Sequence, residues 1–318
     1  MRDAGHILGS AILEIWVKAE NIERKIVFSG DLGQPGRPII RDPYVIDEAD
    51  YLVVESTYGN RRHKALSPSL DELVEIVNDT ISQKQGNVIV PAFAVGRTQE
   101  LIYYLHHLTR VGRLKNLNIF LDSPMAQRVT ELTTRHLELF DKEARKLAAW
   151  RASSEPAVML KFTESVEESI ALNSIRSGAI IIAASGMCTA GRILHHLRHG
   201  LRRPENTVLI TGYQAQGTLG RQLVEGASSV KIFGEDIPVN ADVRSIGGFS
   251  AHADQTAILN WLSRFATAPK KTLIAHGEPD AAKGLKDEID RRFSWNVFIP
   301  APGEKVLLEE TCLLNMPD

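Results

Sequence analysis

Side chains that can bind a metal ion occur at four places where short apolar runs meet glycine-containing loops: His6, Asp31, His252 and His276. Taken singly, each residue is more typical of a turn or of a buried structural position. Taken together they suit zinc, because imidazole nitrogen and carboxylate oxygen are ligands that zinc prefers. A carboxylate such as Asp31 can also bridge two ions about 4 Å apart, a geometry used in phosphodiester hydrolysis. The residues alone leave a metal site and four independent structural roles as open alternatives.

These residues must be positioned by the strands that precede or follow them. Residues 11–17 and 25–28 are predicted to be strands, and Asp31 follows the second of them. Residues 51–54 form a third apolar run, which leads directly into Glu55. Strand ends followed by glycine-containing loops are where α/β proteins usually place their chemistry.

From about residue 66 the sequence alternates between helical and strand patterns. The helices are expected at residues 70–82, 97–109, 191–199 and 256–265, and the strands at 87–91, 118–121, 178–184, 207–211 and 271–275. Alternation of this kind predicts a parallel sheet with helices on its faces. A second α/β module inserted into a first one accounts for the order without a linker.

Composition limits the class of protein. The 318 residues, 43% hydrophobic and 24% charged, are enough for one large or two ordinary domains. A formal net charge of −2 means that nucleic-acid binding would need a local basic groove. Cys188 and Cys312 provide neither a disulfide framework nor a CxxC site, which fits a reducing, cytoplasmic setting. We see no signal-peptide pattern and no apolar run of the ~18 residues that a membrane span needs, so we expect no membrane partner.

Nine short segments follow one another in an order that resembles the β-CASP ribonucleases of the metallo-β-lactamase superfamily. Five of them contain the candidate site residues: 3–10, 29–33, 55–59, 249–254 and 276–278. The other four are 91–97, 122–126, 184–188 and 212–219. The resemblance implies a metallo-β-lactamase αββα sandwich that lacks its amino-terminal part and is split by an inserted β-CASP domain with a parallel sheet. We expect the sandwich at residues 1–60 and 206–318, and the insert at 61–205.

The resemblance also implies roles for the site residues. His6 and His276 would each bind one of two zinc ions, and Asp31 would bridge both ions. His252 would be the general acid that protonates the leaving oxygen, oriented by Glu55. The implied reaction is hydrolysis of single-stranded RNA, internally or from an end, to 5′-phosphate and 3′-hydroxyl products.

Five residues, four of them in the expected insert, follow glycine-rich turns or lie near helix starts, where phosphate oxygens can be held: Arg97, Ser185, Gly186, Arg192 and Arg221. The alternative for each is a capping residue or a solvated charge. The histidine pairs at 106–107 and 195–196 fall inside predicted helices, and we assign them to packing or to the surface.

One family feature is absent, because no His-x-His-x-Asp-His string occurs in the sequence. We therefore expect the sequence to be a fragment that alone is poorly active and holds zinc weakly. A DNA nuclease of the same superfamily and a non-catalytic RNA-binding scaffold subunit remain alternatives. His276 favours RNA by analogy with the family. Relatives that cut DNA carry a valine at the matching position, whereas those that cut RNA carry a histidine. A homodimer is allowed by the sequence but is not indicated by it.

Overall fold

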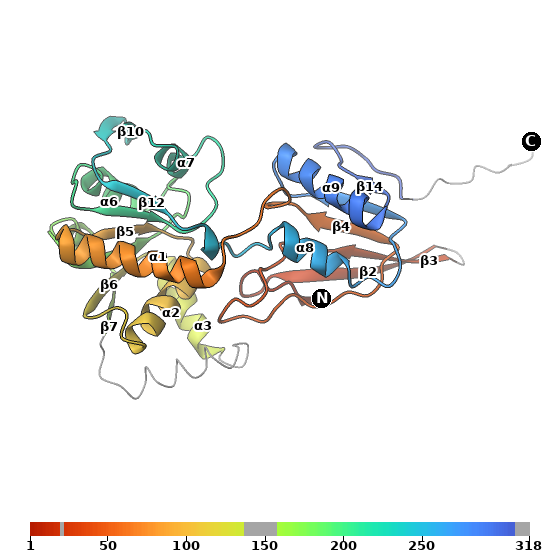
Figure 1. Cartoon of the computed structure of the whole chain (residues 1–318), viewed down its shortest axis with the longest axis horizontal. Helices are drawn as coiled ribbons and strands as arrows, with labels where there is room; N and C mark the ends of the chain where they lie inside the picture. The colour runs from red at the N-terminus through yellow and green to blue at the C-terminus, as the bar shows by residue number, and fades with distance from the viewer. Residues whose placement is uncertain (20–21, 137–157, 309–318) are drawn as a thin grey trace, which may run out of the picture. The chain divides into compact units, whose positions relative to one another are not determined.

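The computed structural model describes residues 1–19, 22–136 and 158–308, which divide into two compact units (Figure 1). The first unit contains residues 1–36 and 42–62 and the chain from His252 onward. The second unit contains residues 37–41 and 63–251. The second unit is thus inserted into the first in the order of the chain.

The first unit is built on a six-stranded sheet with the strand order β1-β2-β3-β4-β13-β14. Its strands are β1 (Arg2–Asp3), β2 (Ala11–Ala19), β3 (Ile22–Phe28), β4 (Tyr51–Glu55), β13 (Lys271–Ala275) and β14 (Val297–Phe298). The first three strands are antiparallel, whereas β3, β4, β13 and β14 run parallel. Because parallel strands end at the same edge of a sheet, the loops that follow β3, β4 and β13 meet there.

Two helices, α8 (Gln255–Leu262) and α9 (Pro279–Phe293), pack with this sheet (Figure 1). The N-terminus of α8 is capped by Asp254, whose side chain accepts a hydrogen bond from the N–H of Ala257. The core between strands and helices contains Val27, Leu52, Val54, Ile258, Leu262, Ile274, Leu285 and Ile289. Burial of these side chains fixes one face of the sheet against the helices.

The same sheet has apolar side chains exposed at β2 and β3. The register places Leu13 opposite Phe28 and Ile15 opposite Ile26, so these four side chains share one face. Ile15 is 42% exposed and Phe28 is 38% exposed. One face of the sheet therefore belongs to the core, while the other presents apolar surface to solvent.

The second unit is built on a six-stranded sheet with the order β12-β9-β5-β8-β6-β7, in which every pairing is parallel. Its strands are β5 (Val88–Pro91), β6 (Leu117–Asp122), β7 (Val158–Phe162), β8 (Ala179–Ala183), β9 (Thr207–Ile210) and β12 (Asp242–Ser245). The parallel sheet predicted for the inserted module is confirmed. A separate antiparallel hairpin is formed by β10 (Ser229–Ile232) and β11 (Glu235–Pro238).

Helices pack on both faces of the second sheet, as the side chains of β5 illustrate. Val88 and Val90 belong to the same core cluster as residues of α1 and α2, whereas Ile89 belongs to a cluster with residues of α6 and α7. Successive strand residues point to opposite faces, so both faces are buried. The helices are α1 (Leu66–Asn78), α2 (Arg97–Arg110), α3 (Pro124–Arg135), α5 (Val166–Leu172), α6 (Ile193–Gly200) and α7 (Leu219–Val224). A π-helical turn (Asp79–Gln83) continues α1, and a 3-10 turn (Gly247–Phe249) precedes the return to the first unit.

The structure differs from the expected return to the first domain at residue 206. Strand β9 pairs with β5 on one side and β12 on the other, and Val208 is fully buried. Residues 206–251 therefore belong to the second unit, and the chain re-enters the first unit at His252. An apolar run such as 207–210 is predicted as a strand whichever sheet it joins, so its pattern cannot place the boundary. No helix in the described part of the chain is long and apolar enough to cross a bilayer.

Candidate functional site

Asp31 lies between two histidines of the first unit, with one carboxylate oxygen directed to each. Its Oδ2 is 3.9 Å from Nε2 of His6, and its Oδ1 is 3.3 Å from Nδ1 of His276. The His252 ring lies between the same two histidines, with centroid distances of 4.1 Å to His6 and 5.9 Å to His276. The four residues singled out from the sequence are thus brought together.

A close backbone approach joins the loop of Asp31 to the loop of His6. The N–H of Gly33 donates to the carbonyl of Ala4 at 2.8 Å. A Cβ atom added to Gly33 would lie 1.7 Å from the carbonyl oxygen of Gly5, so a side chain does not fit here. Gly33 also forms an isolated antiparallel bridge with His252. This glycine therefore lets three site-bearing segments meet.

His276 follows β13 and is held by residues that follow β4. Its φ angle is 51°, in the left-handed region that a residue other than glycine adopts at a cost. The hydroxyl of Thr57 lies 3.2 Å from Nδ1 of His276 and 3.2 Å from its carbonyl oxygen. A Cβ atom at Gly277 would lie 2.2 Å from Oγ of Ser56, so the chain after His276 packs tightly on the same loop. The sequence interpretation missed Thr57, although it lies in the segment 55–59.

Glu55 is a buried carboxylate, 3% exposed, that accepts three hydrogen bonds. Its donors are Nδ1 of His252 at 3.2 Å, the N–H of Leu32 at 2.7 Å and the N–H of Thr57 at 3.2 Å. Burial raises the pKa of the Glu55 carboxyl, but the bonds from His252 and Thr57 outweigh it and bring the pKa below its ordinary value. An ionised Glu55 keeps a proton on Nδ1 of His252 and leaves Nε2 of that ring available for chemistry.

The donor set fits zinc. Within the described residues, His6, Asp31 and His252 are the one group of three whose ligand atoms all lie within 4.8 Å of one another. Imidazole nitrogens with a carboxylate form a set typical of zinc. The two oxygens of Asp31 face different histidines, which is the arrangement a bridging carboxylate requires. His252 lies close enough to be a ligand itself, so the geometry leaves a ligand role and the expected proton-donor role open for this residue.

In the second unit, the carboxyl edge of the parallel sheet carries the loop that contains Ser185 and Gly186. The hydroxyl of Ser185 accepts hydrogen bonds from the N–H groups of Thr189 and Ala190, at 3.0 and 3.3 Å. These bonds stabilise the turn after β8. The side-chain amide of Gln214, from the loop after β9, donates to the carbonyl of Gly186 at 2.9 Å. Loops at this edge are a common ligand position in parallel α/β sheets.

All three arginines predicted to bind RNA pair with carboxylates of the protein. The pairing changes the interpretation of Arg97 and Arg192, which face inward. Arg97 is only 7% exposed and pairs with the neighbouring carboxylate of Glu100, so it is not the accessible phosphate ligand that we expected. Arg192 donates to Asp122 at 2.7 Å and to the carbonyl of Glu164 at 3.3 Å. Arg221 is partly exposed and pairs with Glu225 at 2.6 Å. The sequence pattern at helix starts did not distinguish inward-facing arginines from exposed ones.

Arg192 belongs to a buried polar network around Asp122, the last residue of β6. The fully buried carboxylate of Asp122 also accepts from Nε2 of His196 and from the hydroxyl of Ser169, both at 2.6 Å. Burial raises the pKa of Asp122, but the bonds from His196, Ser169, Thr163 and Arg192 outweigh it and hold the pKa far below its ordinary value. The sequence placed His196 correctly inside a helix but did not indicate its hydrogen bond to Asp122.

Comparison with known proteins gives two matching family descriptions. The family described as "Beta-Casp domain" matches residues 98–223, and "Zn-dependent metallo-hydrolase RNA specificity domain" matches residues 236–300. The chain is 39% identical over 282 residues to Ribonuclease TTHA0252 of Thermus thermophilus, with 89% of this chain and 63% of the relative covered. It is 31% identical over 304 residues to an RNase J-like protein of Methanocaldococcus jannaschii, with 95% of this chain and 68% of the relative covered.

A third relative is the Transcription termination factor FttA of Pyrococcus horikoshii. It is 32% identical over 311 residues, with 94% of this chain and 47% of the relative covered. The chain therefore spans about half to two thirds of the length of the curated relatives it matches.

Proposed function

The chain belongs to the β-CASP ribonuclease family of the metallo-β-lactamase superfamily, and from this premise we propose that its gene product is a zinc-dependent ribonuclease. The substrate is single-stranded RNA, and hydrolysis leaves 5′-phosphate and 3′-hydroxyl ends. The names of two relatives, a ribonuclease and an RNase J-like protein, support RNA as the substrate class.

The observation that carries the proposal is the position of Asp31 between His6 and His276. In the proposed site His6, Asp31 and His276 would hold the zinc, with one oxygen of the Asp31 carboxylate directed to each histidine. Zinc held there would supply a Lewis acid that withdraws charge from the scissile phosphodiester. The protein's own contribution is to hold the two imidazoles and the carboxylate in one fixed arrangement.

His252 is the proposed proton donor to the oxygen that leaves phosphorus. Its Nδ1 is hydrogen-bonded to Glu55 at 3.2 Å, so Nε2 is the nitrogen that faces the reaction. Imidazole suits this task because it can donate and regain a proton near neutral pH. Glu55 acts as a positioning residue that fixes the orientation of the ring through Nδ1.

The experiment compares matched single-stranded RNA and DNA of one sequence, incubated with the full-length gene product and zinc. RNA should be cut much faster than DNA, and end-group analysis should find 5′-phosphates. His252→Ala should abolish cleavage while leaving zinc content largely intact. Equal or faster cleavage of DNA would contradict the ribonuclease assignment. Zinc loss in the His252 variant would instead make this residue a ligand.

A further inference from the structure

The hairpin of β10 and β11 presents an aromatic ring to solvent at its tip. Ile232 pairs with Glu235, so Phe233 and Gly234 alone form the turn, with φ angles of 51° and 83°. Such a two-residue turn favours asparagine or glycine, and a bulky side chain is costly in this conformation. Phe233 is nevertheless 55% exposed, so burial in the core does not explain its presence.

The Phe233 ring lies against an exposed imidazole of helix α6. The ring centroids of His195 and Phe233 are 4.7 Å apart, with an interplanar angle of 37°. Residue 195 is exposed in the described structure, so the two rings form a small aromatic surface that solvent can reach. An aromatic surface of this kind can receive a stacked nucleic-acid base.

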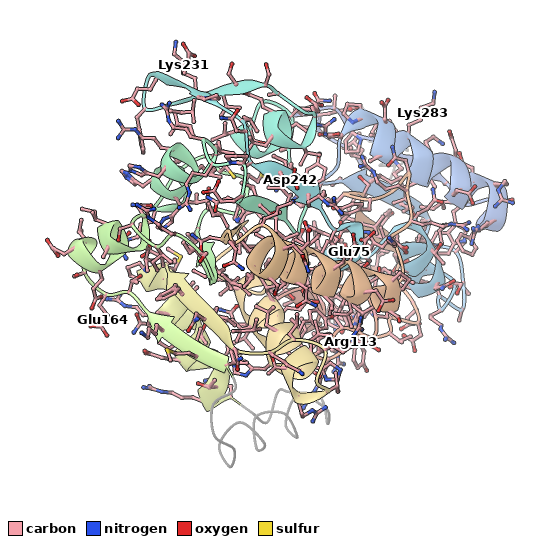
Figure 2. All side chains as sticks on the ribbon, turned by 60° about the vertical axis from the view of Figure 1, so that its left-hand side comes forward. Glu75, Arg113, Glu164, Lys231, Asp242 and Lys283 are labelled. Carbon is pink, nitrogen blue, oxygen red and sulfur yellow. The ribbon has the colours of Figure 1, made fainter. Side chains whose placement is uncertain are left out.

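Cationic side chains lie on α6, directly after it and on the hairpin. Arg198, one turn after His195 on α6, contacts Glu235 of the hairpin at 2.5 Å. Arg202 is exposed, and its charge adds to the hydrogen bond from Arg198 in lowering the pKa of the Glu235 carboxyl. Burial, followed by the nearby charges of Arg198 and other cations, lowers the pKa of His199. Lys231 projects outward from the same hairpin (Figure 2), with Asp236 as its cross-strand neighbour. After these pairs are matched, Arg202 contributes the unbalanced positive charge.

We propose that Phe233, His195 and Arg202 form an α6 platform that binds one base and an adjacent phosphate of single-stranded RNA. The rings supply a stacking surface and the Arg202 guanidinium supplies donors for a phosphate oxygen. RNA is favoured over a protein partner because the platform holds a single large apolar side chain and, once Arg198 is matched with Glu235, a positive charge from Arg202. The inference rests on the proposed ribonuclease function and adds a contact in the second unit that lies outside the residues assigned to catalysis.

Phe233→Asn separates binding from folding. Asparagine adopts the left-handed conformation readily, so the turn is retained and the thermal midpoint should stay equal or rise. Loss of the stacking surface should weaken binding of a single-stranded uridine oligonucleotide by about five- to tenfold. Phe233→Tyr should bind as the native protein does. Ile170→Ala, which removes another side chain that is 62% exposed in the same unit, is the matched control and should leave affinity unchanged.

Arg202→Ala tests the phosphate contact through the dependence of affinity on salt. Removal of one contact to a single strand should reduce the slope of log affinity against log salt by about 0.7. Arg113→Ala is the control, because Arg113 is exposed in the same unit but pairs with Asp71. An unchanged slope in the Arg202 variant would overturn this part of the platform.

All variants are compared in the full-length gene product, with cleavage of a dinucleotide as a second measurement. A dinucleotide is too short to reach beyond the active site, so its cleavage rate should be unchanged in the Phe233 variant. Native protein that neither binds nor cuts RNA would overturn the proposed function and this inference together. Native binding with full affinity in the Phe233 and Arg202 variants would overturn the platform alone. Loss of dinucleotide cleavage in the Phe233 variant would also overturn it, because the defect would then lie in the active site.

Discussion

Nδ1 of His252 lies 3.2 Å from Oε1 of Glu55, and that carboxylate is buried against the backbone N–H groups of two neighbouring segments. These bonds hold Glu55 in its charged form despite burial, since the pKa of its carboxyl lies below the ordinary value. The pair joins β4 to the loop that begins the last segment of the first unit. The orientation of the His252 ring is thus set by a residue that is 197 positions away in sequence.

Glu55→Gln tests this positioning role. The amide keeps the shape of the side chain but removes the charge that favours a proton on Nδ1 of His252. RNA cleavage by the full-length gene product should fall by about ten- to hundredfold, with zinc content unchanged. Glu48→Gln changes an exposed carboxylate of the same unit and should have no effect. Activity within twofold of native would show that His252 does not depend on Glu55.

The strands and the grouping of the candidate site residues were predictable because each carries a local signal. Lys271–Ala275 is a strand at the predicted bounds, and the loops after β3 and β13 do place Asp31 and His276 together. Residues whose role depends on tertiary contacts were not predictable. Arg97 and Arg202 have the same side chain, yet one is buried against Glu100 and the other is exposed. Neither spacing nor composition distinguishes the two environments.

Thr57→Val tests the hydroxyl that lies 3.2 Å from Nδ1 of His276. Valine has nearly the same shape but no hydrogen-bonding group, so the His276 ring should lose its fixed orientation. Affinity for zinc, measured by competition with a chelating dye, should fall by about tenfold or more. Thr57→Ser retains the hydroxyl and should restore affinity. Native zinc affinity in the valine variant would show that the Thr57 hydroxyl does not orient His276.

Zinc content tests the ligand assignment in the 318-residue chain itself. His6, Asp31 and His276 provide fewer protein ligands than two catalytic zinc ions normally have. Elemental analysis after dialysis should therefore find less than two ions per chain, and Asp31→Asn should lower the content further because it weakens the shared ligand. Two tightly held ions in the native chain would contradict this assignment.

Limited proteolysis tests the boundary between the units. A cut near residue 205 would separate β9 from β5, two adjacent strands in the middle of a buried parallel sheet. We expect the carboxyl-terminal limit of the resistant second unit to lie near residue 251, read from fragment masses. A resistant fragment that ends near residue 205 would instead support the boundary expected from the sequence.

Asp122→Asn tests the buried network of the second unit through its dependence on pH. The carboxylate is fully buried and bonded to Arg192 and His196, so its neutral replacement should lower the free energy of unfolding by about 3–5 kcal/mol at neutral pH. The pKa of Asp122 is depressed in the folded state, so its stabilising contribution is present above the ordinary carboxyl pKa of about 4 and is lost as pH falls below it.

The difference between native and variant should therefore shrink as urea unfolding is repeated at successively lower pH. Glu164→Gln is the control, since this side chain projects to solvent in the same unit (Figure 2) and should change stability little at any pH. A constant difference between native protein and the Asp122 variant over the acidic range would show that the charge of this carboxylate does not stabilise the fold.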